Sequence, residues 1–209
     1  MLSTPGARNA SRVGLKVKLE EAFFWRSPVQ VAPDLIGCRL SHQGVTLLIT
    51  ETEAYLGPED AASHARSGPT RRSGVMYGPV GRAYIYKSYG VHLCFNVVCH
   101  LPETGGAVLI RAGEVIDGRA LAESRRGVTK GLADGPGKVS QCLDLSPHLD
   151  GISLFRGAIS LARTSLLETD FIIVRGPRIG ISQNVEKKYR FWLADSVHVS
   201  KPRGGGVPL

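Results

Sequence analysis

The strongest constraint on the fold is an alternation of apolar and polar residues that begins at Leu47. Alternate residues of a β-strand share a face, so Glu51, Glu53 and Tyr55 are predicted to project the same way, about 7 Å apart. Leu47 and Ile49 precede them at the same spacing. The pattern therefore predicts a strand that runs out of a hydrophobic core and into a polar pocket.

The two glutamates of this strand are candidates for acid–base chemistry. A carboxylate at the edge of apolar surroundings has its charged form desolvated, and a second carboxylate nearby disfavours ionisation further. Both effects raise the pKa of Glu51 or Glu53 towards that of a general base. The alternative interpretation is that both side chains are solvated on the outer face of the strand.

A β-hairpin is predicted from two alternating segments, 83–86 and 91–98, which flank a turn at 87–90. Gly90 supplies the positive φ that a tight turn requires. Tyr89 lies near the tip, where an aromatic side chain has little core to enter. It either folds back onto its own hairpin or projects as a wedge that enters a base stack.

A long loop, 57–81, follows the glutamate strand and carries several charged residues. Loops of this length in a compact domain are usually functional. Arg71 and Arg72 are placed to contact phosphates, with a solvated basic loop as the ordinary alternative. His64 could contact a base, serve as a structural histidine or bind a metal. No second histidine or cysteine stands at zinc-ligand spacing, so no metal site is predicted.

Further elements are predicted from their end signals. A short helix begins at Ser27-Pro28, with the serine as its cap. A buried strand is predicted over 107–112, and Arg111 at its end needs an acidic or carbonyl partner. A helix over 115–126 ends at a glycine that follows two arginines. Additional strands are predicted over 149–161 and 170–174.

Several basic residues in the second half of the chain are candidates for phosphate contacts. The motif GPGK opens a helix at 135–138, where backbone N–H groups and Lys138 could hold a phosphate of a DNA backbone. It is not a P-loop, because G-x-x-x-x-G-K-[ST] is absent, and a plain helix start is the alternative. Arg178 and Arg190 are further candidates.

Composition favours one globular domain with a polyanionic partner. The chain has 209 residues, 43% of them apolar, and a net charge of +8. The four cysteines form no C-x-x-C pair and are expected to be reduced, buried thiols of a cytosolic protein. No apolar run approaches a membrane span, so no membrane association is expected.

The order of the predicted elements is typical of an α+β fold with a curved, mainly antiparallel sheet. No linker divides the chain convincingly. We expect a flexible basic arm at 1–18, one domain at 19–200 and a flexible tail at 201–209.

Four features of the sequence occur together: ETEAYLGPED with the histidine that follows it, the tyrosine pair before the hairpin's YG, Asn96, and AVLIRA. Together they resemble the single-domain alkyladenine (3-methyladenine) DNA glycosylase family. The resemblance runs from about residue 24 to 201, and ETEAYLGPED is its most specific part. It implies one α+β domain with a curved antiparallel sheet, surrounding helices and a protruding hairpin.

The resemblance also implies a mechanism. Glu53 would deprotonate a water that attacks C1′ of a damaged nucleotide, and Arg111 would position both. Tyr89 would enter the minor groove and fill the space that the flipped nucleotide leaves. The implied enzyme is a monofunctional DNA glycosylase that needs no metal and no organic cofactor.

The family's base pocket corresponds to four residues of this sequence. The extruded purine would stack between Tyr55 on one side and Tyr86 and His64 on the other, a wall that favours cationic, alkylated rings. Asn96 would crowd an exocyclic 2-amino group and so disfavour normal guanine. The implied partner is double-stranded DNA containing damaged purines. We expect a monomer that acts in the bacterial cytoplasm, at the nucleoid.

Three other functions fit part of the pattern. A non-catalytic module could bind flipped or single-stranded bases through the same tyrosines. A glycosidase could act on sugars with Glu51 and Glu53 as its carboxylate pair, although the net charge of +8 and the Tyr-Gly hairpin argue against it. A metal-dependent hydrolase is the third alternative.

Overall fold

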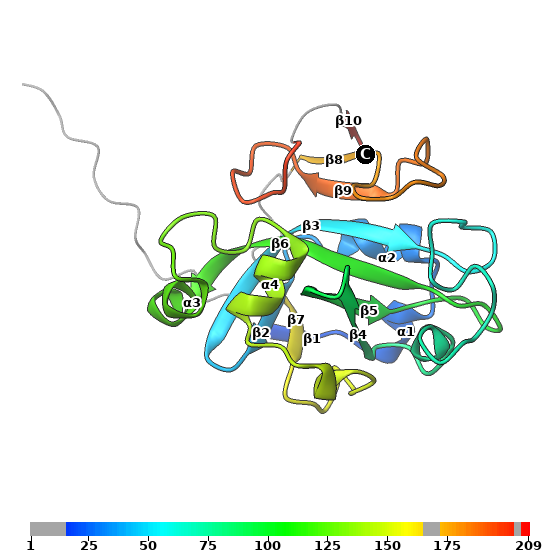
Figure 1. Ribbon diagram of the computed structural model, residues 1–209, viewed down its shortest axis with the longest axis horizontal. Helices are drawn as coiled ribbons and strands as arrows, with labels where there is room; N and C mark the ends of the chain where they lie inside the picture. The colour runs from blue at the N-terminus through cyan, green and yellow to red at the C-terminus, as the bar shows by residue number, and fades with distance from the viewer. Residues whose placement is uncertain (1–15, 165–171, 203–205) are drawn as a thin grey trace, which may run out of the picture.

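The computed structural model describes residues 16–164, 172–202 and 206–209 and has a single α+β domain (Figure 1). The strands are β1 (Lys16–Lys18), β2 (Arg39–His42), β3 (Val45–Tyr55), β4 (Ala83–Ser88), β5 (His92–Val98), β6 (Ala107–Asp117), β7 (Ser160–Thr164), β8 (Ile173–Gly176), β9 (Arg190–Leu193) and β10 (Val207–Pro208). The helices are α1 (Glu21–Phe24), α2 (Pro28–Asp34), α3 (Arg119–Arg126) and α4 (Pro136–Cys142), with 3-10 helices η1 (Gly74–Tyr77) and η2 (Pro147–Leu149).

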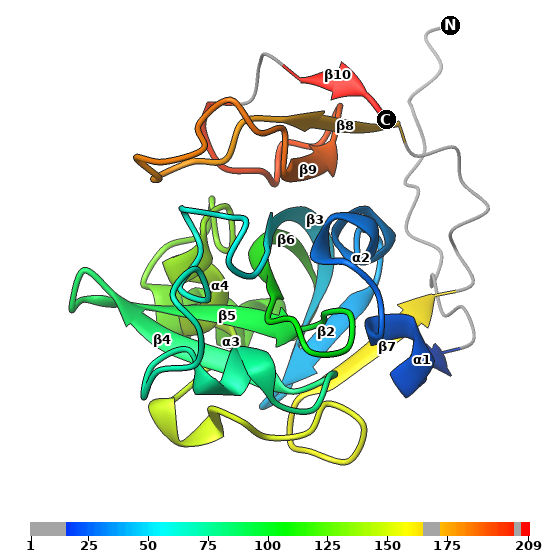
Figure 2. The same ribbon diagram turned by 90° about the vertical axis from the view of Figure 1, so that its right-hand side faces the viewer.

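The strands form one curved sheet, and every strand pairing among the described residues is antiparallel, as the sequence predicts. The main path runs β1-β7-β2-β3-β6-β5-β4. β9 pairs with β3, β8 with β9 and β10 with β8, so these three strands form a layer above β3 in Figure 1. The main path ends in the β4–β5 hairpin, which protrudes from the domain, as Figure 2 shows.

β3 is the hub of the sheet because three strands pair with it. β6 lies along one edge, while β2 and β9 follow each other along the other edge, beside residues 45–48 and 51–53 respectively. This arrangement covers the glutamate-bearing part of β3 on both edges. It places that part inside the protein rather than at a solvated rim.

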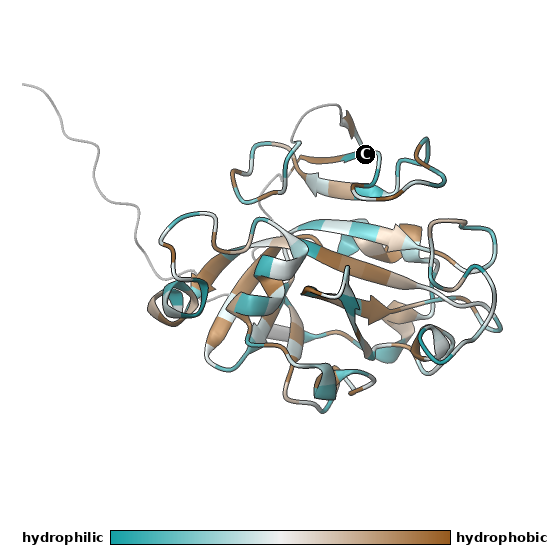
Figure 3. Ribbon diagram, viewed as in Figure 1, coloured by the Kyte–Doolittle hydropathy of each residue, from teal (hydrophilic) through white to brown (hydrophobic). Residues whose placement is uncertain are grey.

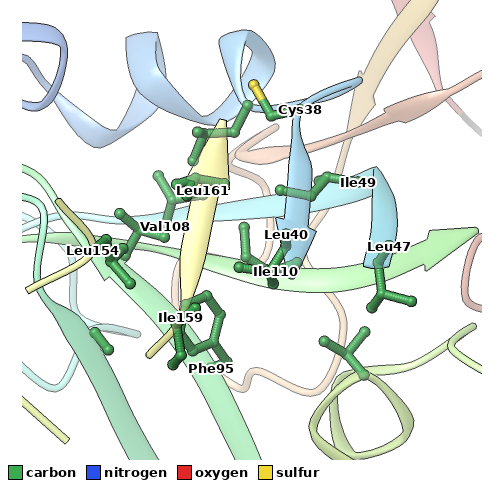
Figure 4. Close-up of a cluster of buried hydrophobic side chains, with 14 of the residues drawn as sticks. Cys38, Leu40, Leu47, Ile49, Phe95, Val108, Ile110, Leu154, Ile159 and Leu161 are labelled. Atoms are coloured by element: carbon green, nitrogen blue, oxygen red, sulfur yellow. The ribbon is translucent and has the colours of Figure 1, made fainter. Parts of the chain in front are cut away.

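A bulge between Ile49 and Glu51 interrupts the β3–β6 register. The prediction that Leu47 and Ile49 share a face with the glutamates is therefore wrong, because an extra residue shifts the alternation of side chains. Both belong to the hydrophobic core with Val108 and Ile110, as Figure 4 shows. The glutamates face the other side of the sheet.

One main core fills the space between the sheet and its helices. Figure 4 shows side chains from β2, β3, β5, β6 and β7 meeting there, among them Leu40, Phe95 and Leu161. α2 packs against β3, and α4 packs against β5 and β6. Figure 3 shows the same division, with hydrophobic stretches along β5 and β6 and hydrophilic residues on many of the surrounding loops.

Several predicted element boundaries are confirmed. The sequence allows residues 39–56 to form one strand, or two strands joined at 42–44. Gln43 (φ 45°) and Gly44 (φ 75°) turn the chain there, so the segment forms two strands, β2 and β3. α2 begins after Ser27 as predicted, although the Ser27 side chain makes no capping hydrogen bond. α3 ends before Gly127, whose φ is 65°.

Three predicted boundaries are wrong. β6 extends well beyond 107–112 because Val115 and Asp117 still pair with β3. α3 therefore begins only after Gly118, whose φ of 73° turns the chain out of the sheet. The strand predicted over 149–161 is limited to its last residues in β7, since Leu149 ends η2. The prediction over 170–174 lies partly outside the described residues, and β8 begins at Ile173.

The four cysteines are buried free thiols, as predicted. Within the described part of the chain, no helix is long and apolar enough to cross a membrane. Residues 1–15 lie outside that part. Val207–Pro208, in the predicted tail, pairs with β8, and the flexibility of both terminal segments stays a prediction.

Candidate active site

A cavity of about 780 Å³ opens beside the glutamate-bearing end of β3. Its walls come from β3, β6, the β4–β5 hairpin, the loop after β3, the start of α4 and residues 179–181. Most of the residues predicted from the sequence line it. They are Tyr55, His64, Arg72, Tyr86, Tyr89, Asn96, Arg111 and Lys138.

Glu53 lies directly behind this wall and is completely buried. Tyr55 donates its hydroxyl to Oε2 at 2.9 Å, Ile179 donates its backbone N–H to Oε1 at 2.8 Å, and Nη1 of Arg111 lies 3.5 Å from Oε2. All three partners line the cavity. Burial raises the pKa of Glu53, against the opposing effects of Arg111 and the two hydrogen bonds.

Glu51 is equally buried but is held more tightly. Nε of Arg190 donates to it at 2.5 Å, Ser200 donates its N–H and hydroxyl at 2.7–2.8 Å, and Nε of Arg111 lies 3.3 Å away. The alternative of two solvated glutamates is therefore wrong. Arg111 has the acidic partners that its position predicts, since it bridges Glu51 and Glu53.

Aromatic rings form one side of the cavity. The rings of Tyr84 and Tyr86 lie 5.3 Å apart between centroids, and His64 meets Tyr86 at 4.6 Å with its plane nearly perpendicular. Nδ1 of His64 is 2.9 Å from the hydroxyl of Tyr84. Burial, with Arg72 and Arg66 nearby, lowers the pKa of His64 to about 4, so this histidine is neutral at physiological pH.

Asn96 lines the cavity between the aromatic rings and the strand that carries Glu53. The register places Asn96 of β5 beside Leu109 of β6, and Leu109 beside Glu53 of β3. Its Nδ2 donates to the backbone oxygen of Tyr84 at 3.0 Å, so the amide is fixed in the wall. A side chain held in this way can exclude a ligand group by contact.

Tyr89 stands at the tip of the hairpin with 88% of its surface exposed. Its φ of 50° and the φ of 70° at Gly90 form the turn, which begins after Ser88 rather than at Lys87. The interpretation in which Tyr89 folds back onto the hairpin is therefore wrong. Tyr89 lines the cavity and remains open to solvent.

The basic residues fall into two groups. Arg71 and Arg72 are exposed, and the guanidinium of Arg72 lies 4.9 Å from the Tyr86 ring centroid. Lys138 is partly exposed and pairs with Asp134 at 2.6 Å. Their contacts with phosphates stay predictions.

Arg178 and Arg190 belong to the other group, and the prediction that they contact phosphates is wrong. Both side chains are at most 2% exposed. Arg178 pairs with Asp60 and Arg190 with Glu51, each inside the protein.

Residues 22–197 match the family model described as methylpurine-DNA glycosylase. The chain belongs to this family. A relative from Rhizobium meliloti is 49% identical over 181 residues, covering 86% of this chain and 94% of its own length. One from Corynebacterium glutamicum is 46% identical over 177 residues, covering 83% and 92%. Both carry names that place them among the 3-methyladenine DNA glycosylases.

Local sequence patterns do not indicate every residue of the site. The Ile179 N–H that holds Glu53 is a backbone group, so no side chain signals it. Ser200 and Asp60 were likewise not predicted, because their partners lie more than 100 positions away in the chain. Within the described residues, no group of three or more histidine, cysteine or acidic side chains could hold a metal ion.

Proposed function

We propose that the protein is a monofunctional DNA glycosylase that hydrolyses the bond between a damaged purine and its deoxyribose. The observation that carries the proposal is the buried carboxylate of Glu53 behind a cavity walled by Tyr55 and Tyr86. Cavities that combine an apolar, aromatic lining with a perturbed carboxylate are typical of active sites. Membership of the methylpurine-DNA glycosylase family supports the same reaction.

The target base must leave the duplex before it can enter this cavity. Tyr89 is suited to fill the gap in the base stack because it is exposed at the tip of the antiparallel β4–β5 hairpin. Arg71, Arg72 and Lys138 would hold the flanking phosphates of double-stranded DNA. We propose that one chain suffices and that it acts on chromosomal DNA in the bacterial cytoplasm.

The lining supports a preference for alkylated purines. Alkylation at N3 or N7 makes a purine cationic, and the faces of Tyr55 and Tyr86 attract cations. His64 is neutral and so adds no positive charge against the base. The proposed substrates are 3-methyladenine and 7-methylguanine, with hypoxanthine and ethenoadenine as further candidates. Asn96 would reject normal guanine by contact with its 2-amino group.

In the proposed reaction the C1′–N bond breaks and its electron pair leaves with the base. The sugar develops oxocarbenium character, which the negative charge of Glu53 stabilises. A water on the cavity side attacks C1′, its oxygen forms the new bond, and its proton passes to Glu53. Arg111 lies between the cavity and both glutamates and would orient this water and Glu53. The products are a free base and an intact strand with an abasic site.

Base release from labelled duplexes tests the proposal. One duplex contains a single hypoxanthine and another is methylated, and hot alkali converts abasic sites into strand breaks. Wild-type protein should release base from methylated DNA, and Glu53→Gln should abolish release while preserving duplex binding. If the wild-type protein binds the duplex but releases no base, the glycosylase activity is refuted and the protein is a DNA-binding module. Release that persists in Glu53→Gln would refute the role of Glu53 as the general base.

A further inference from the structure

Arg178 and Asp60 form a buried, two-point ion pair that no step of the proposed reaction uses. Nη1 lies 2.6 Å from Oδ2 and Nη2 lies 2.7 Å from Oδ1, and the two side chains are 0% and 1% exposed. Nη1 also donates to the backbone oxygen of Ala54 at 2.9 Å. A planar guanidinium is suited to this geometry, whereas a lysine ammonium cannot reproduce it.

The pair connects two segments that meet beside Glu53. Asp60 lies in the loop after β3, where its carboxylate also accepts the backbone N–H groups of Leu56 and Ala62, each at 3.2 Å. Arg178 lies in the segment after β8, which overhangs that loop in Figure 2. The next residue, Ile179, donates its N–H to Glu53. The ion pair therefore fixes the backbone donor that holds this carboxylate.

Arg178 also supports the ring of Tyr55. Its guanidinium carbon lies 4.7 Å from the centroid of Tyr55 and 5.3 Å from that of Tyr189. A cation over the face of an aromatic ring stabilises the ring in that orientation. Since Tyr55 lines the cavity, its face away from Arg178 is the one that a base can use.

We propose that the Arg178–Asp60 pair positions Glu53 and the Tyr55 ring for the glycosylase reaction. The inference rests on the proposed function. Neither residue lines the cavity, so neither touches the base, and both act through Ile179 and Tyr55. They are positioning residues rather than catalytic ones.

A positioning role predicts a change in the pH dependence of the reaction. The titratable or charged groups that interact with Glu53 are Glu51 and Tyr55 on β3, Arg111 on β6, Cys94 on β5 and Arg178 after β8. Among its partners, the Ile179 N–H lowers the pKa of Glu53. Displacing that donor raises the pKa, so the carboxylate is protonated up to a higher pH and the acid limb of the rate profile moves upward.

The test is single-turnover release of 7-methylguanine from methylated duplex as a function of pH, with a thermal melt of each variant. Arg178→Lys keeps the charge but loses the two-point contact. We expect its rate to fall about 100-fold and its acid limb to rise by about one pH unit. The double variant Arg178→Met with Asp60→Asn leaves no unpaired buried charge, so its melting temperature should be higher than that of Arg178→Met alone. Its base-release rate and the acid limb of its pH profile should nevertheless stay altered.

Arg26→Lys is the matched control. Arg26 also pairs with an aspartate, Asp34 at 2.9 Å, and also lies over an aromatic ring, Phe23 at 4.5 Å, but it has no contact with the cavity. The base-release rate of Arg26→Lys and the acid limb of its pH profile should match those of the wild type.

The outcomes separate the inference from the proposed function. A wild-type rate and limb in both Arg178→Lys and the double variant would overturn the positioning role. The positioning role would also be overturned if the release rate fell only in proportion to lost thermal stability and the acid limb stayed at the wild-type pH. If Arg178→Lys fails to fold, the double variant gives the decision by the same two criteria. Absence of release by the wild-type protein would instead refute the glycosylase function before any variant is compared.

Discussion

Replacing Tyr55 with phenylalanine separates the contribution of its hydroxyl from that of its ring. The hydroxyl donates at 2.9 Å to Oε2 of Glu53, a carboxylate with no exposed surface. A hydrogen bond to a charged group contributes about 1.5–3 kcal/mol, and about 1.4 kcal/mol corresponds to a tenfold change in an acid dissociation constant. Tyr55→Phe should therefore raise the pKa of Glu53 by about one to two pH units.

The sign of the effect follows from the proposed role of Glu53. Only its carboxylate form accepts a proton, so a raised pKa moves the acid limb of the base-release rate to higher pH by the same amount. Above both pKa values the variant and the wild type should release base at similar rates, because the phenyl ring still stacks on the purine. The loss is thus confined to lower pH.

The assay is single-turnover release of 7-methylguanine from duplex DNA, followed across the acid and neutral range. Tyr77→Phe is the control, since the Tyr77 hydroxyl donates to the backbone oxygen of Ala65 and has no contact with Glu53. An acid limb of Tyr55→Phe that coincides with the wild type would refute the reasoning. A rate lost equally at every pH would show instead that the hydroxyl takes part in the chemistry.

Three other substitutions have separate expected results. Tyr89→Ala removes a side chain that is 88% exposed, so a thermal melt should match the wild type while release from duplex falls about 5- to 150-fold through lost stacking. Asn96→Ala removes an amide fixed to the backbone of Tyr84 at 3.0 Å, so release of normal guanine should rise relative to 7-methylguanine, measured by chromatography of the freed bases. Arg190→Met leaves Glu51 without its 2.5 Å partner and should lower the free energy of unfolding by about 3–5 kcal/mol, measured by denaturant titration. Equal stability would show that the other partners of this glutamate suffice.

Much of the fold can be predicted from local patterns because the alternation of apolar and polar residues indicates which side of a strand is buried. The alternation of β3 and of the hairpin places Glu53, Tyr86 and Asn96 on faces that border one cavity. The turn chemistry of Tyr89 and Gly90 is equally local. These features depend on neighbours in the chain, although the turn begins after Ser88 rather than at Lys87.

The remaining features depend on contacts between distant segments. Arg178 and Arg190 are candidates for phosphate contacts from the sequence alone, and arginines are mostly exposed in proteins. Their partners, Asp60 and Glu51, lie 118 and 139 positions away. No local pattern indicates such pairs. The bulge before Glu51 has the same origin, since it arises from the pairing of β3 with β6 rather than from the residues of β3 alone.

Glu51 and Glu53 lie two residues apart, yet their partners suit them to different tasks. Glu51 is neutralised by Arg190 at 2.5 Å and also bonded by Ser200, which leaves its oxygens committed to structural contacts. Glu53 pairs with Arg111 at 3.5 Å and accepts hydrogen bonds from two neutral donors, the Tyr55 hydroxyl and the Ile179 N–H. A distant cation and neutral donors stabilise a carboxylate less than a close guanidinium does. Burial therefore prevails at Glu53 and raises its pKa. In the proposed mechanism this makes Glu53 the proton acceptor, while Glu51 holds Arg111 in a position that serves both carboxylates.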